Sequence, residues 1–152
     1  MPLSDLTIRP YDPQDCDDLL AIWLAASRLG HAFLGEKTLL QQQLIVRDVY
    51  LPQAENHVAL VGHIPVGFIG LLDCFIGGLF VAPAFHGMNI GRSLVEHVSP
   101  FKPWLELEVY AANPLAPPFY RKLGFHEISR RAKDVDGRPF ELIRMRRDRQ
   151  PQ

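Results

Sequence analysis

The sequence predicts an α+β fold, in which helices cover the faces of one mixed β-sheet. Apolar stripes at helical spacing alternate along the chain with short, glycine-broken apolar runs that are typical of strands. The elements follow in the order β-α-α-β-β-β-α-β-α-β-β, which favours a sheet flanked by helices. A length of 152 residues with 47% hydrophobic and 22% charged residues fits one globular domain with a substantial core, so we expect residues 1–152 to form a single domain.

The N-terminal third is predicted to contain one strand and two helices, at residues 6–11, 12–30 and 36–50. Asp12 and Pro13 are suited to cap and begin the first helix, which we expect to end near Gly30. The first helix carries an apolar stripe of Cys16, Leu19, Leu20, Trp23 and Ala26, and the second has the four-residue pairs Leu40/Leu44 and Ile45/Val49. We expect both sets to pack inward.

The remainder of the chain alternates strands with two more helices. Strands are expected at residues 57–61, 66–72, 76–81, 105–109, 125–133 and 140–146. A helix beginning near residue 89 should bury Ile90, Leu94, Val95 and Val98, and a short helix at 118–123 is followed by Gly124 as its C′ residue. Asp136-Gly137 is a hairpin-turn signal between the last two strands.

The charge pattern argues against a nucleic-acid partner. The net charge is −1, with six basic and 12 acidic residues up to position 120 and ten basic and five acidic residues after it. The basic run between Arg144 and Arg149 fits a solvated, frayed strand end better than a phosphate-facing surface. A binder of nucleic acid or acidic partners is the least favoured function, because basic and aromatic residues do not interleave.

Cysteine and histidine usage predicts no metal site. Cys16 and Cys74 form no metal-binding spacing and are expected to act as small core residues, while the histidines form no ligand set. The first 18 residues lack an apolar signal-peptide core, and prolines, glycines and Asp73 interrupt the apolar stretch at 64–85. We therefore expect a cytoplasmic protein with no membrane partner.

Residues 79–94 form the most informative stretch. An apolar strand enters a glycine-containing turn, and the turn opens a helix. Free backbone N–H groups and the helix dipole make such a turn suitable for binding phosphate. A tight strand-to-helix connection without a ligand explains the segment equally well.

Residues 113–125 form a second stretch with chemical potential. Tyr120 stands at the start of a predicted helix beside Arg121 and Lys122, where its hydroxyl could donate a proton to a developing anion. Taken alone, a tyrosine in this setting is more often a core or interface residue.

Together the two stretches resemble the GNAT superfamily of acyl-CoA-dependent N-acyltransferases. The shared features are the Val81-x-Pro83 strand end, the turn from His86 to Gly91, Asn113, the Phe119-Tyr120-x-x-x-Gly124-Phe125 segment and the Asp136-x-Arg138 hairpin. The resemblance covers most of the chain. It implies a GNAT-like fold and an N-acetyltransferase that uses acetyl-CoA as its co-substrate, without a metal.

The resemblance also implies roles for individual residues. Leu79, Phe80 and Val81 would pair with the pantetheine arm, and one of their N–H groups would polarise the thioester carbonyl. The pyrophosphate would be cradled by His86, Gly87, Met88, Asn89, Ile90, Gly91, Arg92 and Ser93. Asn113 and Phe119 would lie beside the cofactor, Tyr120 would protonate the leaving thiolate, and Lys122 or Arg121 would meet a nucleotide phosphate.

The chain departs from the family pattern in two places. His86 replaces the usual first residue of the turn and Asn89 replaces its first glycine, although asparagine tolerates unusual backbone angles. The acid that many members carry on the central strand is absent, because Gly77 or Gly78 stands there. Candidate bases are therefore Glu106 and Glu108, which share one strand face, or His31; a free amine could also lose its proton to water.

The resemblance implies that the acceptor is a small-molecule or peptide amine, and the sequence does not identify it. The first two helices and their loop shape the acceptor pocket in this superfamily, and here they offer Trp23, His31 and Phe33, with Leu34 beside them. This apolar lining favours a small or partly apolar amine over a basic protein tail. The alternative function is a non-catalytic coenzyme A or acyl-CoA-binding module on the same fold. Either a monomer or a homodimer through the last strands is compatible with the sequence.

Overall fold

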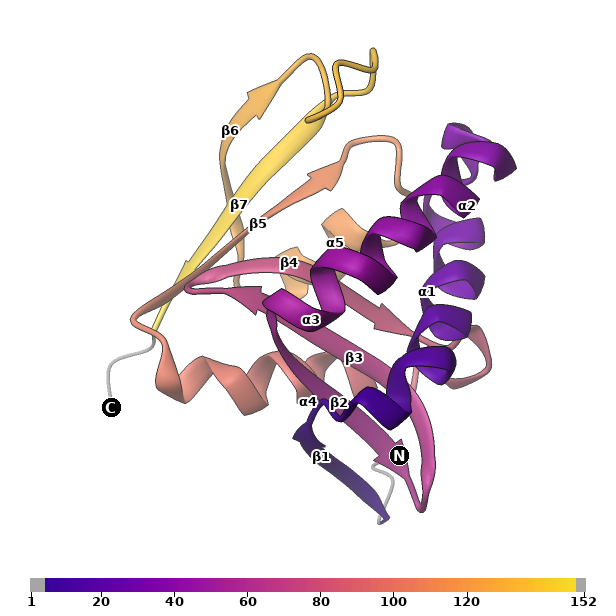
Figure 1. Cartoon of the computed structure of the whole chain (residues 1–152). Helices are drawn as coiled ribbons and strands as arrows, with labels where there is room; N and C mark the ends of the chain where they lie inside the picture. The colour runs from indigo at the N-terminus through magenta and orange to yellow at the C-terminus, as the bar shows by residue number, and fades with distance from the viewer. Residues whose placement is uncertain (1–4, 150–152) are drawn as a thin grey trace.

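A computed structural model describes residues 5–149 of the chain. Its centre is a seven-stranded sheet with the strand order β1-β2-β3-β4-β5-β7-β6 (Figure 1). Only β4 and β5 run parallel, and all other neighbouring strands of the described residues are antiparallel. The predicted α+β class with a mixed sheet is confirmed.

The elements follow the predicted order with small shifts at their ends. The strands are β1 Leu6–Pro10, β2 Glu55–Val61, β3 Ile64–Leu72, β4 Phe75–Val81, β5 Trp104–Tyr110, β6 His126–Arg131 and β7 Leu142–Asp148. The helices are α1 Cys16–Gly30, α2 Glu36–Ile45, α3 Leu51–Gln53, α4 Ile90–Val98 and α5 Ala116–Lys122. A π-helical segment, Val46–Tyr50, joins α2 to α3.

Two hydrophobic cores lie on opposite faces of the sheet. The α4 face contains the four predicted inward residues of that helix together with Tyr120 and Phe125. The α1 face contains Leu19, Ile22 and Trp23 of α1, packed on strand residues such as Phe68. Because strand side chains alternate between faces, neighbouring residues of β3 and β4 serve different cores.

The second helix differs from its prediction. The expected inward residues Leu40, Leu44, Ile45 and Val49 are 44–55% exposed, whereas Leu39 and Leu51 are buried. Four-residue spacing places side chains on a common face but does not say which face packs. The wider π-helical turn after Ile45 then rotates the chain, and Leu51 reaches the core one turn later.

Two further expectations need correction. Both cysteines are half-buried free thiols. Cys16 packs against the α1-side core, as expected, whereas Cys74 lies outside both cores in the tight connection between β3 and β4. The basic C-terminal run is not frayed, since β7 continues to Asp148. Arg147 is 8% exposed and donates to Glu96, Ser99 and the Leu123 carbonyl.

No helix within residues 5–149 has the length and apolar character needed to span a membrane.

The connection from β1 to α1 is fixed by a reciprocal cap. Asp12 accepts the N–H of Gln14 through Oδ1, and Asp15 accepts the N–H of Asp12 through Oδ2 at 2.9 Å. Asp15 is 5% exposed and also accepts two hydrogen bonds from the guanidinium of Arg9, at 2.7 and 2.9 Å. This hydrogen bond from Arg9 lowers the pKa of Asp15.

We expect Asp15→Asn to destabilise the protein by about 1–3 kcal/mol at pH 7, because a buried charge-assisted network loses its carboxylate. The lowered pKa means that this stabilisation is present above about pH 4 and is lost as the pH falls through the folded-state pKa. Urea unfolding of the wild type and the variant should therefore show that the difference between their free energies of unfolding decreases from pH 7 to pH 3. Asp17→Asn, at an exposed position in the first turn of α1, is the control; equal effects of the two changes would contradict the assignment.

Candidate active site

The candidate site, called the cleft below, is the interruption of strand pairing where β4 and β5 part. The two parallel strands pair only at Phe75 with Glu106 and at Ile76 with Leu107. A register shift between β3 and β4 lies at the same level, after Gly70. Beyond it β4 stays bonded to β3, so from Gly77 onward one edge of β4 has no partner strand.

The backbone groups on this open edge belong to alternate residues. Ala82 donates its N–H to the carbonyl of Val66 in β3, at 2.8 Å. In an antiparallel pair, successive residues direct their backbone groups to opposite edges of the strand. The N–H and C=O groups of Phe80 therefore face β3, while those of Leu79 and Val81 face the open edge. Nε2 of His86 lies 2.8 Å from the Val81 carbonyl oxygen and donates to it when protonated there. His86 thus closes the far end of this edge.

The turn after β4 presents the N-terminus of α4 to the same cleft. Gly87 has φ +81° and Asn89 has φ 63°, so Asn89 takes the left-handed conformation that the sequence analysis expected it to tolerate. The N–H groups of the first turn of α4 then point outward without helical partners. Ile90 is buried and anchors the turn, and the Ser93 hydroxyl donates to the Asn89 carbonyl. The other residues predicted to cradle the pyrophosphate, Met88, Gly91 and Arg92, lie in the same turn and in the first turn of α4.

Short helix α5 follows β5 and packs against the turn before α4. Oδ1 of Asn113 accepts the N–H groups of Leu115 and Ala116, at 2.9 and 3.1 Å, and so starts the helix two residues before the predicted point. This capping role uses the oxygen of Asn113 and leaves its amide nitrogen to face Gly30. Phe119 packs closely on Gly91, where an added Cβ would lie 3.0 Å from the ring. The helix and the turn are therefore in direct contact.

Tyr120 is held rigidly within this arrangement. Its ring centroid lies 5.0 Å from that of Phe119 and 5.3 Å from that of Phe125, both edge-on. Its side chain is 6% exposed, and burial raises its pKa. No hydrogen bond among residues 5–149 uses its hydroxyl. Lys122 and Arg121 lie in the last turn of the same helix.

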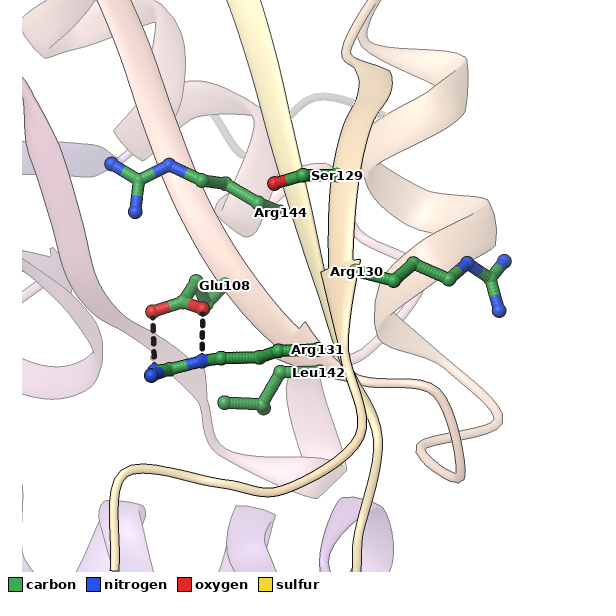
Figure 2. Close-up of a pocket in the computed structure, with 6 residues that line it drawn as sticks. All are labelled: Glu108, Ser129, Arg130, Arg131, Leu142 and Arg144. Atoms are coloured by element: carbon green, nitrogen blue, oxygen red, sulfur yellow. Dashed lines mark hydrogen bonds and ion pairs between the residues drawn. The ribbon is translucent and has the colours of Figure 1, made fainter.

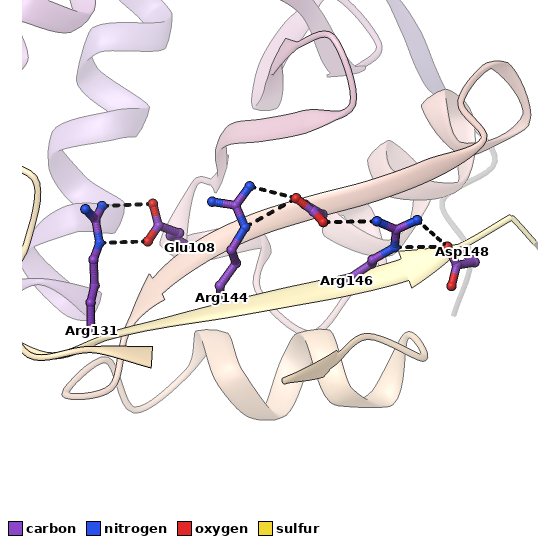
Figure 3. Close-up of polar contacts among 6 residues, drawn as sticks. Glu108, Arg131, Arg144, Arg146 and Asp148 are labelled. Atoms are coloured by element: carbon purple, nitrogen blue, oxygen red, sulfur yellow. Dashed lines mark hydrogen bonds and ion pairs between the residues drawn. The ribbon is translucent and has the colours of Figure 1, made fainter. Parts of the chain in front are cut away.

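Glu106 and Glu108 share one face of β5, as predicted, and this is the α1 face. Both form ion pairs with arginines of β6 and β7, and Figure 3 shows Glu108 with Arg131 at one end of this row and Arg144 and Arg146 further along it. Glu106 bonds Arg144 at 2.7 Å and Arg146 at 3.2 Å, and the bond from Arg144 lowers its pKa. Glu108 accepts two bonds of 3.0 Å from Arg131 alone.

Of the two carboxylates, Glu108 lies beyond the last β4–β5 pair. It borders a surface hollow of about 200 Å³ (Figure 2). The other residues that line this hollow are Ser129, Arg130, Arg131, Leu142 and Arg144. Glu108 therefore stands on the parted side of the sheet, whereas Glu106 stands at its closed end.

An aromatic cluster closes one end of the α1 face. Phe33 lies 5.2 Å from Tyr110 and 5.0 Å from Phe140, and His31 lies 5.2 Å from Tyr110, between ring centroids. The hydroxyl of Tyr110 donates to buried Asp134 at 2.8 Å, which fixes the β6–β7 loop. Burial lowers the pKa of His31 to about 4. His31 is therefore a neutral and weakly basic imidazole near pH 7.

The structure does not bring every candidate to the cleft. Trp23 is 4% exposed and lies in the α1-side core, 6.0 Å from Phe80, so it supports the central strand from beneath. Sequence reasoning missed Tyr110, Phe140 and the arginine partners of the two glutamates. Arg144 and Arg146 are two residues apart, which indicates that they share one strand face. Their contact with the glutamates of β5 could not be predicted, because it depends on which strands are neighbours in the sheet.

Within the described part of the chain, no three histidine, cysteine, aspartate or glutamate side chains come together in a way that could hold a metal ion.

Comparison with known proteins gives one consistent result. A family model described as "Acetyltransferase (GNAT) domain" matches residues 52–127. The peptidyl-lysine N-acetyltransferases named YjaB of Salmonella typhimurium and Escherichia coli are both 33% identical over 141 residues, or 92% of this chain and 97% and 95% of theirs. The peptidyl-lysine N-acetyltransferase YiaC of Escherichia coli is 33% identical over 122 residues, covering 80% of this chain and 84% of its own.

Solved structures agree with these sequence matches. The solution structure of the apo-form of YjaB from Escherichia coli has a TM-score of 0.84 at 32% identity, covering 93% of this chain and 96% of that one. The PaiA N-acetyltransferase of Thermoplasma acidophilum, solved in complex with coenzyme A, has a TM-score of 0.77 at 15% identity, covering 94% and 98%. At 15% identity, the similarity to the Thermoplasma acidophilum protein shows a shared fold alone.

Replacing Asn89 tests the turn before α4. A β-branched residue is strained at a positive φ, so Asn89→Val should weaken the affinity for coenzyme A about tenfold, while Asn89→Gly should preserve it. Calorimetric titration measures both variants. 3′-Dephospho-coenzyme A keeps the pyrophosphate and should show the same factor. Equal affinities for Asn89→Val and the wild type would remove the turn from ligand binding.

Proposed function

Since this chain belongs to the GNAT acetyltransferase superfamily, we propose that it transfers the acetyl group of acetyl-CoA to the side-chain amine of lysine in a peptide or protein. The observation that carries this proposal is the open edge of β4, which leads along the chain into the turn at the N-terminus of α4. The unpaired backbone groups on this edge, followed by the helix N-terminus, fit an extended, amide-bearing ligand that ends in a pyrophosphate.

The fit to acetyl-CoA rests on three features of the chain. The open-edge groups of Leu79 and Val81 can pair with pantetheine amides as a neighbouring strand would. The left-handed turn at Asn89 aims the free N–H groups of α4 at a pyrophosphate. Phe119 packs on Gly91 in this turn, and in our proposal Asn113, which caps α5, lies beside the pantetheine arm while Lys122, in the last turn of α5, meets the nucleotide end.

The reaction needs one bond to form and one to break. The neutral amine nitrogen attacks the thioester carbon, and the N–H of Leu79 stabilises the negative charge that develops on the carbonyl oxygen. The C–S bond then breaks, the amine loses one proton and the thiolate gains one. Val81 offers only its N–H to the pantetheine arm, because His86 already bonds the carbonyl oxygen of Val81.

Tyr120 is the proposed proton donor to the thiolate. Burial raises its pKa, so the phenol is fully protonated at neutral pH. Its ring is clamped between Phe119 and Phe125, and no hydrogen bond among the described residues diverts its hydroxyl. A thiolate that is held nearby therefore meets a fixed and available proton.

Glu108 is the proposed proton acceptor on the amine side, directly or through one water molecule. Glu106 lies at the closed end of the cleft and is bonded by two arginines, which lower its proton affinity. His31 is a weak base, because its pKa is about 4. Glu108 has one arginine partner, lies beyond the last β4–β5 pair and borders the hollow over β5, β7 and β6.

The acceptor assignment revises the expectation from sequence. The apolar loop residues favoured a small or partly apolar amine, whereas the relatives that match most of the chain are named as peptidyl-lysine N-acetyltransferases. The cluster of Phe33, Tyr110 and Phe140 suits the four-carbon stem of lysine as well as it suits an apolar amine. A lysine side chain therefore satisfies both observations.

The proposed function is tested with a lysine peptide whose N-terminus is blocked. Wild-type protein should release free thiol from acetyl-CoA in the presence of this peptide, and not with a matched peptide in which arginine replaces lysine. Tyr120→Phe should keep the affinity for acetyl-CoA and lower kcat about 100-fold, because the proton donor is lost. Binding of acetyl-CoA without transfer to any amine would instead support a non-catalytic module.

Glu108→Gln separates the amine side from the thiol side. We expect kcat to fall about tenfold or more, with the largest deficit at low pH, where the amine is most protonated. Glu127→Gln removes a carboxylate that is also paired with arginine, on β6 and outside the cleft, and is the control. Equal rates for both variants, at equal thermal stability, would exclude Glu108 as the base.

A further inference from the structure

A patch without side chains lies on the α1 face of the sheet at the point where the cleft opens. Gly78 of β4 pairs with Gly70 of β3, and Gly77 is the extra residue at the register shift beside them. Three glycines therefore leave a gap in the layer of side chains that normally covers a strand face.

Tyr50 fills the part of this gap that lies over Gly77. A Cβ added at Gly77 would lie 1.7 Å from the Tyr50 hydroxyl oxygen and 2.5 Å from Cζ. A side chain on Gly77 and the phenol of Tyr50 cannot coexist, so the hydroxyl occupies the place of the missing strand side chain. Tyr50 thus delivers a polar group to the central strand, from a helix instead of from the strand itself.

The position of Tyr50 is determined by two local features. It is the last residue of the π-helical segment Val46–Tyr50, a wide turn of a kind that often occurs at functional sites. Asn56, which is 6% exposed, donates its amide N–H groups to the carbonyl of Tyr50 and to those of Leu51 and Ala54 just after the segment, the last two at 3.2 Å. The same asparagine fills the neighbouring gap over Gly70, where its Oδ1 lies 2.6 Å from an added Cβ.

The hydroxyl of Tyr50 lies at the reacting end of the proposed cleft. The last residue pair between β4 and β5 is Ile76 with Leu107, directly before Gly77. Leu79, whose N–H faces the open edge, is two residues further along β4, or about 7 Å at the rise of a strand. This separation leaves room for a thioester carbonyl and an amine nitrogen between the two groups.

No hydrogen bond among residues 5–149 uses the Tyr50 hydroxyl, although its main-chain carbonyl accepts bonds from Asn56 and Ala54. A partly buried phenol without a protein partner is costly unless water or a ligand satisfies it. The hydroxyl is therefore available to a molecule that enters from the α1 face, on which Glu108 and the aromatic cluster also lie.

We propose that the Tyr50 hydroxyl binds the acceptor amine and orients it so that the lone pair of the amine nitrogen points at the thioester carbon. This role rests on the proposed acetyltransferase function. The phenol oxygen accepts one N–H of the neutral amine, which restricts the rotation of the nitrogen. Burial raises the pKa of Tyr50, so the phenol stays neutral and acts by position, while the amine proton leaves to Glu108 or water. Gly77 is required because any side chain there would displace the phenol.

Tyr50→Phe tests this role, since it keeps the ring over Gly77 and removes only the hydroxyl. We expect kcat/KM for the lysine peptide to fall about tenfold, with the dissociation constant for acetyl-CoA and the thermal midpoint unchanged. Gly77→Ala should reproduce the loss, because its methyl group collides with the hydroxyl. Tyr11→Phe removes another phenol that is partly buried, near the far edge of the sheet, and should leave the rate unchanged.

The outcomes separate this inference from the proposed function. An active wild type with an unchanged kcat/KM in Tyr50→Phe overturns the role of Tyr50 and leaves the function standing. A wild type that transfers no acetyl group to any amine overturns both. If Gly77→Ala does not fold, the comparison of Tyr50→Phe with Tyr11→Phe still decides between the two results.

Discussion

The parting of β4 from β5 is the constraint on which the rest of the structure depends. Backbone groups inside a sheet are normally bonded on both sides, and here two residue pairs are followed by an unpaired edge within the middle of the sheet. Such an edge is stable only when other groups satisfy it. Within the described chain His86 bonds one carbonyl of this edge, and in our proposal the amides of the co-substrate take the other positions.

The C-terminal half of the sheet has to remain folded without a helix over its α1 face. Figure 1 shows β5, β7 and β6 turning away from α1 and α2. The exposed face is instead covered by ion pairs and stacked guanidinium groups, with Arg144 5.4 Å from the Phe75 ring centroid and Arg146 4.8 Å from that of Trp104. Exposed ion pairs contribute little one by one, but this row ties three strands together and keeps the cleft face open.

How far the sequence predicts the structure depends on whether the information is local. The α4 stripe, the Asn89 turn and Gly124 were predicted correctly, because capping, helical period and positive φ are properties of adjacent residues. The inward face of α2 was not, since its apolar residues surround the helix and the π-helical turn changes their direction. The partners of Glu106 and Glu108 depend on strand order, and the contact of Tyr50 with Gly77 depends on a register shift, neither of which leaves a local pattern.

The two faces of the sheet divide the proposed reaction between them. The α4 face holds Tyr120 and the turn for the co-substrate, and the α1 face holds Glu108, Tyr50 and the aromatic cluster. A continuous sheet would separate these groups by a layer of bonded backbone. The gap between β4 and β5 is the place where that layer is absent, so an amine from one face can reach a thioester bound along the other. A glycine at position 77 then follows from the same geometry, because the acceptor side needs its polar group at the margin of this gap.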